Sequence, residues 1–211
     1  MADDIKPVKI ISFDKYTLYA PSAAGVRKAK LVWGVRDGNP RIAVFTNDPA
    51  DTTLNGVISA PMDPVTFYTY IELLKKAAAA TSEIKYKLDC FTSRRDEEGK
   101  PGDKFLLSEV YVGKDSDGMV WVSVVAENRP KLKFVFSVSD WHKIYKADGT
   151  ELSKGEYSSV ATIATINALL PMYQYYMQKA NDDYMSRPKK AANGAYAQQA
   201  SKEDTDDINF M

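Results

Sequence analysis

Residues 84–95 read Ile-Lys-Tyr-Lys-Leu-Asp-Cys-Phe-Thr-Ser-Arg-Arg, which has the two-residue period of a β-strand. One face of this strand is apolar and holds Ile84, Tyr86, Leu88 and Cys90. The opposite face holds Lys85, Lys87 and Phe91. The strand ends on Arg94 and Arg95. Lysines beside an exposed ring suit a sugar-phosphate chain and its bases. The alternative is an ordinary half-exposed antiparallel sheet whose lysines face solvent.

Other stretches have the same strand pattern and also place basic residues on one face. We expect strands over 8–19, 26–36, 41–47, 105–112, 119–126 and 131–138. The candidate phosphate-contacting residues on these strands are Lys28, Lys30, Arg36, Lys131 and Lys133. The candidate stacking rings besides Phe91 are Trp33, Tyr111 and Trp121. Phe91 is the strongest of these because it shares a face with lysines, whereas both tryptophans share faces with aliphatic residues.

Two helices complete the expected elements. Asp63 and Pro64 supply an N-cap and a first helical residue, so the first helix is predicted over about 63–80. Apolar residues at helical spacing predict a second helix over about 157–180. Pro171 lies inside it and is expected to kink or interrupt it. This helix either covers an open sheet or pairs with a second subunit.

The predicted fold is mainly β with two helices, in the α+β class. Three strands, a helix and two strands follow the element order of an OB-fold, a partly open five-stranded barrel. We therefore expect an OB-fold-like barrel extended by at least one strand and a C-terminal helix. A β-sandwich with two helices is the alternative architecture.

Composition limits the possible classes of protein. The 211 residues carry 28 basic and 28 acidic side chains, but the last eleven contain Lys202 and four carboxylates, which leaves 27 basic and 24 acidic residues in the body. The single cysteine, Cys90, excludes an intrachain disulfide and indicates a reducing, cytoplasmic location. An acidic start without an apolar run behind it predicts no secretory signal, and the lack of a stretch of about eighteen apolar residues predicts no membrane span.

No catalytic or metal-binding pattern is present in the sequence. His142 is the only histidine and has no partner at a meaningful spacing. The sequence contains no phosphate-binding glycine motif, nucleophile elbow or metal-binding helix motif. We therefore expect no enzyme activity, no cofactor and no metal.

The C-terminal segment has a different composition from the body. Residues 181–211 are poor in aliphatic side chains, which predicts a disordered linker and tail after a domain over residues 1–180. The chain finishes Glu-Asp-Thr-Asp-Asp-Ile-Asn-Phe-Met at 203–211. Such a tail can occupy the protein's own cationic groove or bind a partner; a solubilising tail is the alternative. The expected partner-binding residues are Asp204, Asp206, Asp207, Ile208 and Phe210.

The body and tail together resemble the single-stranded-DNA-binding proteins of tailed bacteriophages. The resemblance rests on the OB-like element order, the interleaved basic and aromatic residues, and the tail Asp206-Asp207-Ile208-Asn209-Phe210. Met211 departs from the usual pattern, in which the chain ends on the aromatic residue. The resemblance implies sequence-tolerant coating of single-stranded DNA during phage replication and recombination, in the host cytoplasm. It also implies recruitment of replication proteins by the tail.

The function hypotheses come from different classes. In the leading one, lysines and arginines contact phosphates while rings stack on bases, through Lys28, Lys30, Trp33, Arg36, Lys85, Lys87, Phe91, Arg94, Arg95, Tyr111, Trp121, Lys131 and Lys133. The second is a structural or assembly protein of a virion, with no nucleic-acid role. An enzyme with an unrecognised site is the third. A homodimer is compatible with all of them.

Overall fold

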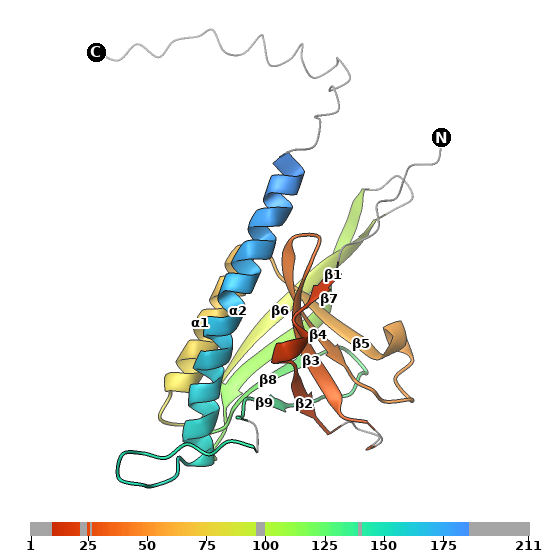
Figure 1. The fold of residues 1–211 in the computed structure, drawn as a ribbon. Helices are drawn as coiled ribbons and strands as arrows, with labels where there is room; N and C mark the ends of the chain where they lie inside the picture. Colours follow the sequence, from red (N-terminus) through yellow and green to blue (C-terminus); the bar gives the residue numbers. More distant parts are fainter. Residues whose placement is uncertain (1–9, 22–24, 26, 96–99, 139–140, 186–211) are drawn as a thin grey trace, which may run out of the picture.

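The computed structural model describes residues 10–21, 25, 27–95, 100–138 and 141–185. Each half of the chain forms an antiparallel sheet followed by a helix (Figure 1). The first half contains β1 (Ile10–Ser12), β2 (Leu18–Ala20), β3 (Ala29–Arg36), β4 (Asn39–Phe45), β5 (Val57–Pro61) and α1 (Pro64–Ala79). The second half contains β6 (Ile84–Arg95), β7 (Pro101–Lys114), β8 (Val120–Val125), β9 (Phe134–Val135) and α2 (Lys154–Met185). In the first half, β1 and β2 occupy the same place beside β3, so each sheet is four strands wide.

The strands form two separate antiparallel sheets. In sheet A, β1 and β2 both pair with β3, so they act as one strand interrupted by the short 3₁₀ turn Asp14–Tyr16. The order of sheet A is then β3, β4 and β5, and the order of sheet B is β6, β7, β8 and β9. The predicted α+β class with two helices is confirmed. The described strands form no closed five-stranded barrel, because β6, β7, β8 and β9 pair with one another in that order and not with sheet A.

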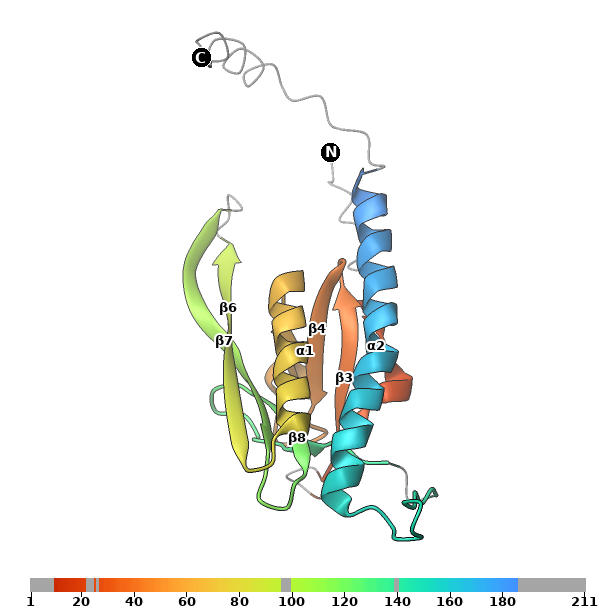
Figure 2. The ribbon, with the colours of Figure 1, turned by 90° about the vertical axis from the view of Figure 1, so that its left-hand side faces the viewer.

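One apolar core lies between the inner faces of the sheets and the two helices. Figure 2 shows α1 and α2 side by side over the same side of the strands. The largest fully buried side chains of this core include Trp33, Phe67, Tyr70, Phe134 and Tyr173. The helices therefore cover the inner side of both sheets. The opposite faces carry exposed residues such as Phe91 and buried ones such as Val32 and Ala43.

The start of α1 is as the sequence predicts. The Asp63 carboxylate accepts a hydrogen bond from the backbone N–H of Thr66 at 3.0 Å, and Pro64 is the first helical residue. The apolar stripe of this helix is buried in the core.

Pro171 was expected to kink or interrupt the C-terminal helix, and it does not interrupt it, because α2 runs continuously from Lys154 to Met185. Proline removes the hydrogen bond to the carbonyl four residues earlier, which belongs to Asn167. Pro171 and Asn167 are both exposed, so water can satisfy that carbonyl and the helix continues. Within the described ranges, no helix is both long and apolar enough to cross a membrane.

Tyr173 fastens α2 to sheet A. Its buried hydroxyl accepts a hydrogen bond from the N–H of Gly34 at 3.1 Å and donates one to the carbonyl of Arg41 at 3.2 Å. Its ring lies 4.1 Å from that of Phe67 on α1, between centroids. One side chain thus joins both helices to the β3–β4 hairpin.

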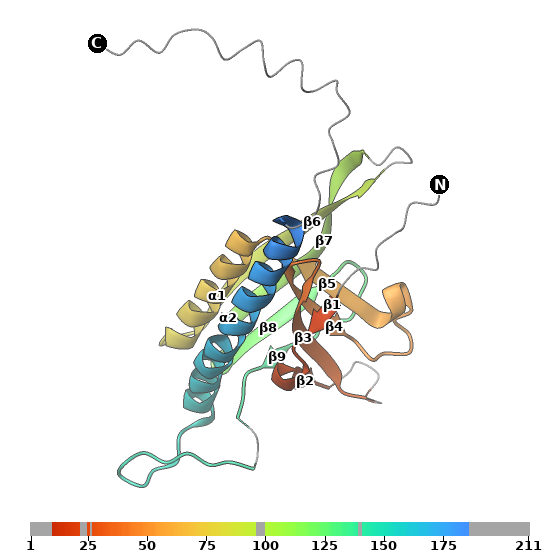
Figure 3. The ribbon, with the colours of Figure 1, turned by 45° about the horizontal axis from the view of Figure 1, so that its top comes forward.

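The edges of the two sheets meet at two places. β2 of sheet A lies beside β9 of sheet B, as Figures 1 and 3 both show. At the other edge, two carbonyls of β5 accept hydrogen bonds: Ser59 from the hydroxyl of Ser108 on β7 at 2.9 Å, and Val57 from Arg129 in the loop after β8 at 3.4 Å. These contacts protect the free edge of β5 from other strands.

Candidate nucleic-acid interface

The outward face of sheet B carries polar and aromatic side chains in cross-strand rows. Successive strands align Lys85 with Gly113 and Trp121, Lys87 with Tyr111 and Ser123, and Asp89 with Glu109 and Val125. Residues at the alternate positions of β8, such as Val122 and Val124, belong to the core. We call the surface formed by these nine aligned residues the sheet B face.

Trp121 lies across β7 because residue 113 is a glycine. A Cβ atom at that position would be 2.8 Å from Cζ2 of the indole, closer than such atoms approach. The missing side chain therefore gives the ring its place on the sheet. The ammonium group of Lys133 lies over the same ring, 5.4 Å from its centroid.

Tyr111 has the same combination of ring and cation. The Lys85 ammonium lies 4.4 Å from the centroid of the Tyr111 ring. The Tyr111 hydroxyl donates a hydrogen bond to Glu109 at 3.0 Å, which fixes the orientation of the ring. Both Tyr111 and Trp121 are half-buried, so each ring is held in place while part of it remains open to a ligand.

The lysines of this region differ in their pairing. Lys87 forms ion pairs with Glu109 and with Asp89, and Lys133 forms one with Asp115. The hydrogen bonds with Glu109 and Asp89 raise the pKa of Lys87, and the Lys87 ammonium holds the pKa of Glu109 below its usual value. Lys85 and Lys131 form no ion pair with any carboxylate in the described residues. These two lysines have the charge most available to a phosphate.

The sheet B face is hollowed by two adjoining grooves. One of about 300 Å³ is lined by Lys85, Tyr111, Trp121, Lys131 and Lys133, among others. The second, of about 340 Å³, shares Glu109, Val125 and Lys131 with the first and reaches Leu106. Phe91 pairs with Leu106 across β6 and β7, and 57% of its surface is exposed. The structure thus brings seven of the predicted residues to this side of sheet B: Lys85, Lys87, Phe91, Tyr111, Trp121, Lys131 and Lys133.

Trp33 corrects the sequence prediction. It is fully buried, and its ring packs 6.0 Å from that of Phe136, between centroids. A ring with no exposed surface cannot stack on a base, so Trp33 is a core residue. Its neighbours on the inward face of β3, Leu31 and Val35, are core residues too.

The remaining predicted residues lie elsewhere. Lys28 lies just before β3 of sheet A, Lys30 lies near the start of that strand, and Arg36 is at its far end beside Asp37. The backbone of Arg94 and Arg95 ends β6, but their side chains fall outside the described residues. The same is true of the whole tail, with Asp204, Asp206, Asp207, Ile208 and Phe210.

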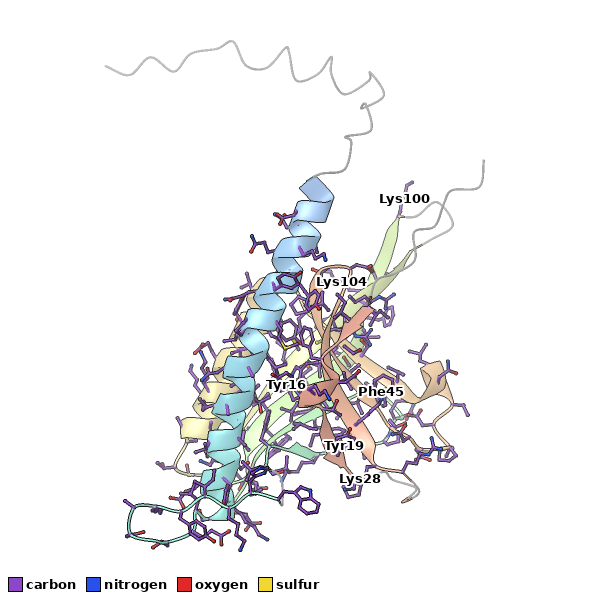
Figure 4. All side chains as sticks on the ribbon, in the orientation of Figure 1. Tyr16, Tyr19, Lys28, Phe45, Lys100 and Lys104 are labelled. Atoms are coloured by element: carbon purple, nitrogen blue, oxygen red, sulfur yellow. The ribbon has the colours of Figure 1, made fainter. Side chains whose placement is uncertain are left out.

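Some exposed residues with suitable chemistry were missed from the sequence. Tyr19 on β2 has 59% of its surface exposed, and Phe45 on β4 lies under the Lys30 ammonium at 4.5 Å. Figure 4 shows Tyr19, Phe45 and Lys28 close together over sheet A. Lys100 and Lys104 are exposed at the start of β7 (Figure 4). Strand pairing was the missing information, because it alone places Tyr19 and Phe45 beside Lys30.

The described part of the chain contains no cluster of three His, Cys, Asp or Glu residues suited to a metal ion. His142 is exposed, and burial raises the pKa of the Cys90 thiol, which makes it a weak nucleophile. Comparisons with protein-family models, curated proteins and solved structures find no match for this chain.

Proposed function

We propose that the protein binds single-stranded nucleic acid, without strong sequence preference, through the sheet B face. The observation that carries the proposal is the pair of half-buried rings, Tyr111 and Trp121, each with a lysine ammonium held over it in one groove. Every base has a flat π-surface, so such rings stack on any sequence, while lysines contact the phosphates between bases.

The shape of the face favours single strands over duplex. In a duplex, base faces are stacked on one another and are closed to a protein ring. The rings of the sheet B face lie in grooves along a sheet, so they can reach only bases that are already unstacked. Sequence-tolerant affinity then comes from about 1–3 kcal/mol for each stacked base, together with the phosphate contacts.

The biological setting follows from the resemblance to phage single-stranded-DNA-binding proteins and is part of the proposal. In this setting the protein coats single-stranded DNA during replication and recombination in the host cytoplasm, and it has no enzymatic activity. The acidic tail recruits replication proteins through Phe210 and the neighbouring carboxylates. An OB-type barrel is not needed for this function, because rings and cations on an open sheet provide the same contacts.

The proposal is tested with Trp121→Ala and a fluorescently labelled oligothymidylate. We expect Trp121→Ala to weaken binding by about 1–3 kcal/mol, the value of one base stack. Trp141→Ala is the matched control, because Trp141 is 92% exposed on the loop before α2 and lies outside the sheet B face. Equal affinity of the two variants would contradict the proposal.

An assembly protein is the second candidate, and one surface favours it. An apolar groove of about 480 Å³ runs between α1 and α2, lined by Ala78, Ala79, Val160 and Ile163, among others. Half of the surface of Val160 is exposed there. Sedimentation velocity over a range of concentrations separates the candidates: an assembly protein forms stable oligomers without nucleic acid and does not bind single strands.

A further inference from the structure

The outward face of sheet A carries a second row of rings and cations. Strand pairing aligns Tyr19 on β2, Lys30 on β3, Phe45 on β4 and Val57 on β5. Each neighbour of Lys30 along β3 points into the core, so Lys30 and its row face outward. The row therefore alternates ring, cation and ring across three adjacent strands, with the Lys30 ammonium 4.5 Å from the Phe45 centroid.

A similar row on sheet B ends on β9, the strand that lies beside β2. There Lys85, Gly113, Trp121 and Val135 are aligned on β6, β7, β8 and β9. Val135 alternates with the core residues Phe134 and Phe136, and Tyr19 precedes the core residue Ala20, so both side chains point outward. β9 lies beside β2, so the two rows end on neighbouring strands (Figure 3), with Val135 on β9 and Tyr19 on β2.

The charges of sheet A also suit a polyanion. Neither Lys28 nor Lys30 is paired with a carboxylate in the described part of the chain, whereas Lys87 and Lys133 on sheet B are. The Lys28 carbonyl accepts a hydrogen bond from the Asn47 side chain at 2.7 Å, which fixes the backbone at the start of β3. Both lysines are thus free to contact phosphates beside Tyr19 and Phe45.

We propose that one nucleic-acid strand crosses both sheets, passing from Trp121 over Val135 to Tyr19 and Phe45. The inference rests on the proposed function and adds a second subsite, on sheet A, for the same single-stranded ligand. Paired strands in a sheet are about 4.8 Å apart, so the three steps within the sheets, from β8 to β9, β2 to β3 and β3 to β4, add up to roughly 14 Å, and the step from β9 to β2 between the sheets adds to this distance. A strand of a few nucleotides fills one sheet, and only a longer one reaches both.

The test compares oligothymidylates of about 5 and about 15 nucleotides, lengths that bracket the site sizes of single-strand-binding domains. We expect the longer strand to bind the unmodified protein more tightly. Tyr19→Ala should weaken binding of the longer strand roughly ten-fold and leave the shorter one unchanged, since a single stack is worth about that factor. Tyr175→Ala, an equally exposed tyrosine on α2, should change neither.

The possible results separate this inference from the proposed function. If Trp121→Ala weakens both strands but Tyr19→Ala weakens neither, the sheet A subsite is wrong and the proposed function stands. If no single strand binds the unmodified protein, the proposed function fails and the subsite with it. Photo-crosslinking of the longer strand gives an independent readout on the folded, unmodified chain: a crosslink at Tyr19 supports the subsite, and crosslinks confined to sheet B contradict it.

Discussion

Gly113 decides where the Trp121 ring of the sheet B face lies. Its missing side chain leaves room for the Trp121 indole, and a Cβ there would also approach the carbonyl oxygen of Ile84 to 2.5 Å. Gly113→Ala should therefore displace the ring and cost about 1–3 kcal/mol of stability through overpacking.

The displacement of Trp121 can be followed by ¹⁹F NMR on protein labelled with fluorotryptophan. The chain has three tryptophans, and Trp33 and Trp141 lie away from Gly113 in the core and on a loop. We expect a large shift for one resonance, that of Trp121, together with weaker single-strand binding. An unchanged Trp121 resonance would show that the glycine does not position the ring.

Phe91 provides a test of side-chain role at a single position. Because 57% of it is exposed, Phe91→Ala should leave the melting temperature within a degree or two of the unmodified protein. Binding of single-stranded DNA should weaken by about 1–3 kcal/mol if the ring stacks on a base. A variant that melts early but binds normally would assign Phe91 to packing instead.

At the scale of elements, one buried ion pair ties the loop before β5 to the loop after β8. Nε and Nη2 of Arg129 lie 2.6 and 2.7 Å from the two carboxylate oxygens of Asp51, and Thr46 donates a further hydrogen bond to Asp51 at 2.7 Å. Both charged side chains are almost fully buried. Burial alone would raise the pKa of Asp51, but the hydrogen bonds from Arg129 and Thr46 lower it overall.

Asp51→Asn should reduce the free energy of unfolding by about 3–5 kcal/mol at neutral pH, because it leaves the Arg129 charge buried and unpaired. The lowered pKa means that the unmodified protein has this stabilisation above the ordinary pKa of an aspartate and loses it as the pH falls through the folded-state value. Urea unfolding from pH 7 down to pH 3 measures both effects. Glu72→Gln, which breaks an exposed pair with Lys75, is the control and should change little.

Local signals in the sequence were sufficient to predict individual elements, including α1 with its Asp63 cap and the alternation of β6. They failed where solvent exposure or distant contacts decide the outcome. Pro171 does not break α2, where Asn167, the residue whose carbonyl it leaves unpaired, is exposed, and Trp33 is buried because its strand face meets Phe136, which follows β9. Neither fact can be read from the neighbouring residues in the chain.

At the scale of the whole molecule, the arrangement of the strands required long-range information. The same strand order is compatible with a closed barrel or with two sheets, and the choice depends on which edges pair. Here β2 lies beside β9, and the β5 edge is covered by Ser108 and Arg129. These edges place the end of sheet A beside the end of sheet B. Seven of the predicted DNA-binding residues were found at sheet B, whereas Tyr19 and Phe45 on sheet A were missed.

The most direct test of the central claim is the affinity for single-stranded and duplex DNA of equal length, measured across a range of salt concentrations. We expect tight binding to the single strand and weak binding to the duplex. If Lys28, Lys30, Lys85 and Lys131 each neutralise one phosphate, log K for the single strand should fall by about 3 for each tenfold rise in salt. Equal affinity for duplex, or single-strand binding that does not change with salt, would contradict the account.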